Sequence, residues 1–443
     1  MKMQMILTML QFGYTPPVVL TGTVLMILLV MLGMLIVNLL TFRRLAPVRV
    51  EDEALPFLSV LVPARNEEPC IAACVRSLVA QQYEPLEVLV LDDDSTDNTT
   101  AIVQQIIDAL PPEQRGRLRL LHGEPLPPGW VGKNFACHQL AQHARGAYLL
   151  FTDADTVHAP AMARSVIRAM REYGVDLLTA QPEFQLGSLG ERLIIPLLNF
   201  TILTLLPIAL IPRRPEPALA TGNGQLLCFR AAIYHAIGGH AAVKARMLED
   251  VLLARAVKAA GYRLLFMDAF DLVRCRMYRS FAEVWTGFSK NLYAFYNYSP
   301  VFALLALLLN FVLFVLPALI SLSALFVPQP ALAIFFAFCA YLVSVSMRVL
   351  LTLRFTRTQR GLMLALCLLH PFSILLECLI LLNSMRWHYS KRGMLWKGRY
   401  YVERDSGQQT HSHREIVAMR QIDQPEHEQA GREENARNQQ RQS

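Results

Sequence analysis

The feature that most constrains the fold of this sequence is a stretch of about 25 mostly apolar residues, Val18–Phe42, which contains no charge and is followed by Arg43 and Arg44. A helix of this length rises far enough to cross a hydrocarbon layer of about 30 Å. We therefore expect a transmembrane helix at 18–42, after an N-terminal segment at 1–17. Later apolar stretches predict transmembrane helices at 300–327 and 331–353 and a transmembrane or re-entrant helix at 361–385.

The charges give these helices an orientation. Lys and Arg favour the cytoplasmic side, so the arginine pair after the first helix predicts a multi-pass protein of the cell membrane whose central part faces the cytoplasm. With 53% hydrophobic and 17% charged residues, the chain is neither an ordinary soluble enzyme nor disordered. Loops that face anionic lipid explain the net charge of +7, so we expect membrane lipids and no nucleic acid as partners. The eight cysteines form no CxxC pair, which favours reduced thiols.

Residues 54–299 carry ordinary charge and alternate strand-like with helix-like patterns. This order predicts an α/β fold with a mostly parallel, doubly wound sheet that binds its ligand at the carboxyl ends of the strands. Within this domain, prolines interrupt the apolar segment 189–212, which favours an interfacial segment over a spanning helix. The tail at 403–443 is rich in Gln, Glu and Arg, and we expect it to be disordered. We predict strands at 57–62, 87–91, 118–121 and 148–152 and a helix at 70–82.

Polar side chains cluster at four places where the predicted fold has strand ends or loops. The clusters are residues 63–68, 92–97, 153–155 and 249–250. Carboxylates close together are costly unless protons, cations or hydrogen-bond donors compensate them. If the last three clusters meet at one edge of the sheet, a divalent cation with a phosphorylated ligand would compensate them. Taken singly, each cluster also has a structural explanation as a helix cap, a turn or a first-turn charge pair.

Several motifs in this order resemble a known family. VPARNEE, LDDDSTDNT, GWVGKNFACHQLA, TDAD and LED closely resemble the motifs of family 2 glycosyltransferases with a GT-A fold, and the resemblance covers residues 58–291. The flanking apolar stretches resemble the membrane-bound branch of this family. Within that branch, residues 127–136 and 287–291 are most similar to carotenoid glucosyltransferases of the hydroxychlorobactene type. Residues 396–400 resemble a C-terminal motif of the same branch.

The resemblance implies a nucleotide-sugar site. Asp92 or Asp93 would accept a hydrogen bond from the uracil ring of a UDP-sugar donor, and Lys133 would approach the diphosphate, where a compact cation offsets the departing charge. The remaining residues that the resemblance assigns to this site are Pro63, Arg65, Glu67 and Asp153.

The resemblance also implies a metal ligand and a base. Asp155 would bind Mg²⁺ or Mn²⁺, which would bridge the diphosphate oxygens and stabilise the leaving nucleoside diphosphate. Asp250, beside Glu249, would remove the proton of the acceptor hydroxyl as its oxygen attacks the sugar. Direct attack of this kind inverts the configuration at the anomeric carbon.

The acceptor side departs from the family pattern. Processive and ceramide-type relatives carry a QxxRW-like motif after the base, whereas this chain has Trp285 and Lys290 in that region. These two residues would replace the motif by stacking and by pairing with phosphate, or they are an interfacial aromatic and a snorkelling lysine. An acceptor-side loop, or alternatively an ordinary turn, is expected at Gly222, Asn223, Gly224 and Gln225.

Three functions remain open from the sequence. The leading hypothesis is an inverting glycosyltransferase that transfers a hexose, glucose from UDP-glucose, to the hydroxyl of a membrane-soluble lipid such as a carotenoid. The second keeps this chemistry and changes the acceptor to a hopanoid, a glycerolipid, a ceramide-like lipid or a polyprenyl phosphate. The third is a non-catalytic membrane scaffold or transporter with a vestigial nucleotide fold, against which the retained acidic clusters argue.

Overall fold

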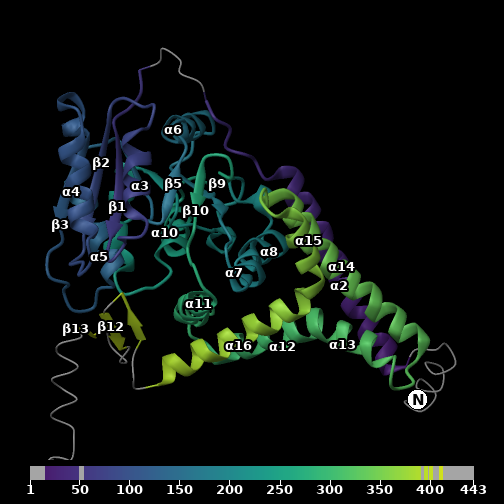
Figure 1. Cartoon of the computed structure of the whole chain (residues 1–443). Coiled ribbons are helices and arrows are strands. Elements are labelled where there is room, and N and C mark those ends of the chain that lie inside the picture. The colour runs from purple at the N-terminus through teal and green to yellow at the C-terminus, as the bar shows by residue number, and fades with distance from the viewer. Residues whose placement is uncertain (1–14, 49–53, 391–393, 398, 403–408, 413–443) are drawn as a thin grey trace, which may run out of the picture.

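The structure is a computed structural model that describes residues 15–48, 54–390, 394–397, 399–402 and 409–412 (Figure 1). Residues 1–14 of the predicted N-terminal segment and most of the predicted tail lie outside these residues. Within the tail, β13 (Gln409–Ser412) pairs with β12 (Arg399–Val402), which in turn pairs with β11 (Met394–Trp396).

The centre of the fold is a seven-stranded sheet with the order β3-β2-β1-β4-β8-β6-β9. Neighbouring strands are parallel except that β8 runs antiparallel to both β4 and β6. The expected GT-A-like α/β fold is therefore confirmed, with one antiparallel strand inside the sheet. The strands are β1 (Leu58–Ala64), β2 (Leu86–Asp92), β3 (Leu118–His122), β4 (Tyr148–Phe151), β6 (Leu177–Gln181), β8 (Leu227–Arg230) and β9 (Leu264–Asp268).

A second, three-stranded sheet lies at the carboxyl end of β4. Its strand β10 (Val273–Cys275) lies between β5 (Thr156–His158) and β7 (Glu183–Phe184), antiparallel to the first and parallel to the second. Because β5 follows β4 after only four residues, this small sheet holds the Asp153–Asp155 loop from one side.

Helices cover both faces of the large sheet (Figure 1). In α3 (Ile71–Val79) the buried residues recur at helical spacing, Ile71, Cys74, Val75 and Leu78, so one face packs on the sheet. Its core also contains Val60, Val88 and residues of α6 (Met162–Glu172). The opposite core holds Leu61 and Leu89 against α5 (Gly132–His143) and α10 (Glu249–Ala259). Further helices of the domain are α4 (Thr99–Ala109), η1 (Pro112–Arg117), η3 (Pro217–Leu219), α9 (Ala231–Ala236) and η4 (Gly239–Val243).

Among the residues that the structure describes, four helical segments are long and apolar enough to cross a membrane: Pro16–Thr41, Pro300–Ser323, Ala331–Phe355 and Arg360–Tyr389. In Figure 1, α2 and α14 run side by side, and α16 passes along α12 beneath α11 (Phe281–Phe295). The segments comprise α2 (Pro16–Thr41), α12 (Pro300–Asn310) with the π-helical turn η5 (Phe311–Val315) and α13 (Leu316–Ser323), α14 (Ala331–Phe355), and α15 (Arg360–Leu366) with η6 (Cys367–Leu369) and α16 (His370–Tyr389).

The predicted interfacial segment forms two short helices and a turn: α7 (Leu189–Ile194), α8 (Pro196–Leu205) and η2 (Ile208–Leu210). The fully buried side chain of Asn38 on α2 joins this segment to the membrane helix, because its amide donates to Leu203 O and Leu206 O, both at 2.8 Å, and accepts from Ile208 N at 3.0 Å. These bonds satisfy backbone groups that the break before Pro207 exposes.

Arginines at the ends of two membrane helices bind the end of β9. Asp268 Oδ2 lies 3.3 Å from Arg44 Nε and 2.5 Å from Arg354 Nη2, and Asp271 pairs with Arg44 and Arg357. One hydrophobic core also contains residues of both the sheet and α2 and α14. The α/β domain and the membrane helices are thus packed as one body.

The segment Arg360–Tyr389 begins and ends beside the α/β domain. It follows Arg357, which pairs with Asp271, and it precedes Lys397, which pairs with Glu67. The chain changes direction at η6, immediately before Pro371. Both ends of this segment therefore lie beside the same domain, which a re-entrant helix requires and a single spanning helix does not.

Candidate active site

Four loops meet at the carboxyl edge of the sheet around the side chain of Lys133. This lysine follows the first residue of α5, and its Nζ lies 2.7 Å from Asp153 Oδ1 and 2.9 Å from Glu249 Oε1. Burial alone would lower the pKa of Lys133, but the carboxylates of Asp153 and Glu249 hold this pKa well above its usual value. The structure therefore brings together three residues that the sequence analysis assigned to one site.

The side chain of Asn134 joins α5 to the segment that precedes α10. Its side chain is fully buried, and its Nδ2 donates to Val243 O at 2.8 Å and to Arg246 O at 2.9 Å, in the loop that leads into α10. The sequence analysis missed this residue, which lies next to Lys133. Its partners are backbone carbonyls, which leave no side-chain pattern.

Asp250 lies in the first turn of α10, next to Glu249, and is held by backbone donors. Its Oδ2 accepts from Gly224 N at 3.1 Å and its Oδ1 from Val251 N at 2.8 Å. Burial, and then the neighbouring Glu249 carboxylate, raise the pKa of Asp250 to about 7. A carboxylate with a pKa near neutrality can both accept and release a proton at physiological pH, which suits a general base.

The loop at 222–225 packs directly against these carboxylates. A Cβ on Gly222 would overlap the carbonyl of Asp250, and a Cβ on Gly224 would lie 3.0 Å from Lys133 Nζ. Asn223 Nδ2 donates to Gln181 Oε1 at 3.1 Å, and Gln225 Nε2 donates to Asp153 Oδ2 at 3.4 Å. The loop thus lies in the site, and its acceptor-side role remains a prediction.

Asp155 has the character of a cation ligand. Its Oδ1 is buried and has no hydrogen-bond partner. Burial, and then the Asp153 and Glu67 carboxylates, raise the pKa of Asp155 to about 7, so a cation beside it would relieve an unfavourable charge. Across the part of the chain that the structure describes, no three His, Cys, Asp or Glu side chains group as metal ligands. Asp155 therefore fits a metal ion whose other ligands come from a bound diphosphate.

The loops after β1 and β2 form a second part of the site. Pro63 lies within β1, and the Nη1 of Arg65 donates to the carbonyl oxygens of Asp93 and Asp94. The carboxylates of Asp92 and Asp93 are buried, and Asp92 Oδ1 has no hydrogen-bond partner. A buried acceptor of this kind suits a ligand N–H.

The helix-cap explanation holds for one acidic residue of the second cluster. Asp97 Oδ1 accepts from Thr99 N at 3.0 Å, at the start of α4. Burial would raise the pKa of Asp97, but the hydrogen bonds that it accepts from Thr99 and from Glu68 N lower it. Its charge is therefore accounted for without a ligand.

The two acceptor-side residues on α11 have different surroundings. Lys290 interacts electrostatically with Glu249 and Asp153, which places its side chain near the carboxylate cluster. Trp285 instead lies against the ring of Phe281, with centroids 5.9 Å apart, where α11 meets α7. Of these two side chains, Lys290 is the one that interacts electrostatically with the acidic residues.

The C-terminal hairpin of β11 and β12 adds a residue that the sequence analysis had not assigned to the site. Lys397, in the turn of this hairpin, forms an ion pair with Glu67, and its carbonyl oxygen accepts from Arg65 Nε at 2.8 Å. The sequence signal for Lys397 was the resemblance of residues 396–400 to a C-terminal motif, but this resemblance assigned no function to the lysine.

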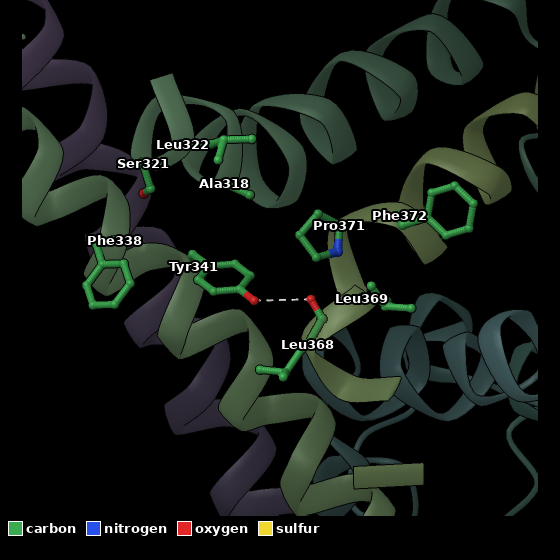
Figure 2. Close-up of a pocket in the computed structure, with 9 residues that line it drawn as sticks. All are labelled: Ala318, Ser321, Leu322, Phe338, Tyr341, Leu368, Leu369, Pro371 and Phe372. Carbon is green, nitrogen blue, oxygen red and sulfur yellow. Dashed lines mark hydrogen bonds between the residues drawn. The ribbon is translucent and has the colours of Figure 1, made fainter. Parts of the chain in front are cut away.

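A cavity of about 360 Å³ lies away from this site, among the membrane helices (Figure 2). Tyr341 donates from its hydroxyl to Leu368 O at 3.1 Å beside it. The lining is almost entirely apolar and consists of Ala318, Ser321, Leu322, Phe338, Tyr341, Leu368, Leu369, Pro371 and Phe372. None of these residues belongs to the acidic clusters.

Comparison with known proteins supports the family resemblance. The model described as glycosyl transferase family 2 matches residues 59–204, which include the predicted donor residues up to Asp155 and end before Glu249. A 4,4'-diaponeurosporenoate glycosyltransferase of Staphylococcus aureus (strain MRSA252) is 25% identical over 250 residues. That alignment covers 53% of this chain and 60% of the relative, which is less than two thirds of its length.

A solved structure shares the fold. A mannosyltransferase from Pyrobaculum calidifontis, in complex with GDP-Man and Mn²⁺, matches 82% of this chain and 97% of its own, with a TM-score of 0.51 and 18% sequence identity. This likeness extends beyond the region matched by the family model.

Proposed function

Because residues 59–204 form a glycosyl transferase family 2 domain within a GT-A-like fold, we propose that this protein is an inverting membrane glycosyltransferase. It transfers a hexose, glucose from UDP-glucose, to the polar end of a membrane-soluble lipid, a carotenoid. The observation that carries the proposal is the meeting of Lys133, Asp153, Glu249 and Asp250 at the carboxyl edge of the sheet. A cation and a base are the two groups that such a transfer requires beside a diphosphate-sugar.

Asp250 acts as the base. Its pKa of about 7 allows it to take the acceptor's proton at neutral pH, while the acceptor oxygen attacks the anomeric carbon. Gly224 N and Val251 N hold the carboxylate in one orientation during this step. Lys133, which Asp153 and Glu249 keep protonated, lies close enough to compensate the charge on the leaving diphosphate.

Asp155 would hold the divalent ion, Mg²⁺ or Mn²⁺. The support is its buried Oδ1 without a hydrogen-bond partner, together with the charge of Asp153 beside it. A bound ion supplies Lewis-acid stabilisation of the diphosphate. Arg65 orders the loop after β2, so that the buried Asp92 and Asp93 can accept hydrogen bonds from the base of the nucleotide.

The acceptor is proposed from the relative and from the surroundings of the site. The Staphylococcus aureus relative is named for a carotenoid acid, 4,4'-diaponeurosporenoate. In this chain, α11 carries Lys290 towards the carboxylates and packs along α16 of the membrane segment. A long apolar acceptor would therefore approach the site from the membrane side, with its polar end towards Asp250.

The membrane topology follows from the contacts of each helix end. α2 and α14 reach the α/β domain through Arg44 and Arg354, so each crosses the membrane towards it, and α12–α13 crosses away from it. The segment Arg360–Tyr389 starts and finishes beside this domain, so it is re-entrant. The domain faces the cytoplasm of the cell, because the arginines lie on its side of the membrane.

The test is transfer of labelled sugar to lipid. The full chain, in nanodiscs, is incubated with Mn²⁺ or Mg²⁺, total lipid and one radiolabelled donor, which is UDP-glucose, UDP-N-acetylglucosamine or GDP-mannose. An Asp108→Asn variant serves as a control, because Asp108 is exposed on α4. We expect the label of UDP-glucose in a coloured lipid. Label in a colourless lipid would replace the carotenoid by another acceptor. No lipid label from any donor would contradict the proposal and favour a non-catalytic scaffold.

A further inference from the structure

The C-terminal hairpin connects the membrane segment to the proposed donor site. After α16 the chain returns to the loop that follows β1, where the Nζ of Lys397 pairs with Glu67 and lies 3.4 Å from Asn66 O. Arg65 links the hairpin turn to the loop that follows β2, because its Nε donates to Lys397 O and its Nη1 donates to Asp93 O. The hairpin turn is therefore held at the loop where the nucleotide is expected.

Three lysines from distant parts of the chain face this region. Lys133 is bound by Asp153 and Glu249. Burial lowers the pKa of Lys290 to about 7. The charges of Lys133 and Lys397 act in the same direction, and the carboxylates of Glu249 and Asp153 act against it. A polyanion bound beside these lysines would favour the charged form of Lys290 and oppose this shift.

We propose that Lys397 is a diphosphate-binding residue, whose ammonium leaves or shares its contact with Glu67 and binds the diphosphate of the sugar donor. This inference rests on the proposed function and extends it to a residue 332 positions away from Arg65. In the transfer, the bond between the anomeric carbon and the diphosphate oxygen breaks, and its electron pair stays on that oxygen. The acceptor oxygen forms the new bond and gives its proton to Asp250. Lys397 compensates the charge that the diphosphate oxygen gains.

This assignment also accounts for the missing QxxRW-like motif. That motif would supply a cation after the base, and here the ammonium of Lys397, with which Lys290 interacts electrostatically, would take that place. A lysine is suited to this task because its compact ammonium binds phosphate as a point charge.

The test separates the diphosphate from the rest of the nucleotide. Affinities for UDP and UMP, with Mn²⁺ present, are measured by calorimetry on the full chain in nanodiscs for wild type, Lys397→Met and Lys397→Arg. Lys244→Met is the matched control, because Lys244 is an exposed lysine outside the site. We expect the ratio of UDP to UMP affinity to fall about tenfold in K397M, to stay within threefold of wild type in K397R, and to be unchanged in the control.

A second variant separates binding from tethering. Glu67→Gln removes the ion pair of the hairpin but keeps the Lys397 ammonium. If Lys397 binds the diphosphate, the UDP-to-UMP ratio of E67Q stays at or above the wild-type value. An unchanged ratio in K397M, equal loss of UDP and UMP affinity, or an E67Q ratio as low as that of K397M would overturn the proposal. A wild-type protein that binds neither nucleotide, nor GDP and GMP in parallel, would instead contradict the proposed function itself.

Discussion

Replacement of Gly222 by Ala should inactivate the protein, because the start of α10 leaves no room for a side chain there. A Cβ at this position would lie 2.5 Å from the carbonyl carbon of Asp250 and 3.0 Å from Val251 N, both of them backbone atoms. The nearest atom is the carbonyl oxygen of Asp250, and relief of its overlap to an ordinary contact of 3.4 Å requires a displacement of about 1.1 Å of the loop or of the first turn of α10. A misplacement of about 1 Å at a reacting group can cost about 100-fold in rate. Overpacking of this kind costs about 1–3 kcal/mol of stability.

The assay combines initial rates of sugar transfer with thermal unfolding of the same preparations. We expect Gly222→Ala to lower the rate about 100-fold and to leave a folded protein. Gly224→Ala should have a smaller effect, since its Cβ would meet the movable ends of Lys133 and Asp153. Gly116→Ala is the control, because its Cβ would have no atom within 4 Å. A G222A rate within threefold of wild type would refute the argument that this contact positions Asp250.

Three further changes test other parts of the site and of the fold. Asp250→Asn should lower the transfer rate about 10²–10⁴-fold with little change in UDP affinity. The base acts only when deprotonated, and its pKa is raised to about 7, so wild-type kcat/KM should rise about tenfold between pH 6 and pH 8, and a flat profile would contradict this role. Asp155→Asn should abolish the effect of Mn²⁺ on UDP affinity in calorimetry; a retained effect would exclude Asp155 as the metal ligand. Asn38→Leu leaves three backbone groups of the α8–η2 region without partners and should lower the free energy of unfolding by about 2–4 kcal/mol in denaturation experiments, whereas a change below 1 kcal/mol would contradict the bridging role.

Local patterns in the sequence were sufficient for much of the fold. β1 and β2 were predicted because apolar runs precede polar loops. In the structure β1 begins one residue later and ends two residues later than predicted, and β2 is longer by one residue at each end. The approach of Asp153 and Glu249 to each other was a conditional expectation from strand ends that share one edge of a sheet, and the place of Lys133 beside them was implied by the family resemblance.

Contacts between distant backbone groups could not be predicted in this way. Asn134 binds Val243 O, 109 residues away, and nothing in the side chain of Val243 indicates that its carbonyl oxygen is needed. Lys397 reaches Arg65 across 332 residues, because the segment Arg360–Tyr389 both begins and ends beside the α/β domain. That direction depends on the bend at η6, where hydropathy alone is compatible with either a spanning or a re-entrant helix.

The arginine pairs at β9 limit how the protein can meet its acceptor. Asp268 pairs with Arg44, which follows α2, and with Arg354 of α14, so the sheet cannot tilt or rise relative to these helices without breaking both pairs. In the proposed reaction, Asp250 would consequently be kept at one height relative to the lipid. The acceptor would then have to cover the distance, which would favour a lipid whose reactive group emerges at that height. Selection by depth would exclude molecules with a suitable hydroxyl buried midway along the chain, whatever their affinity for the membrane.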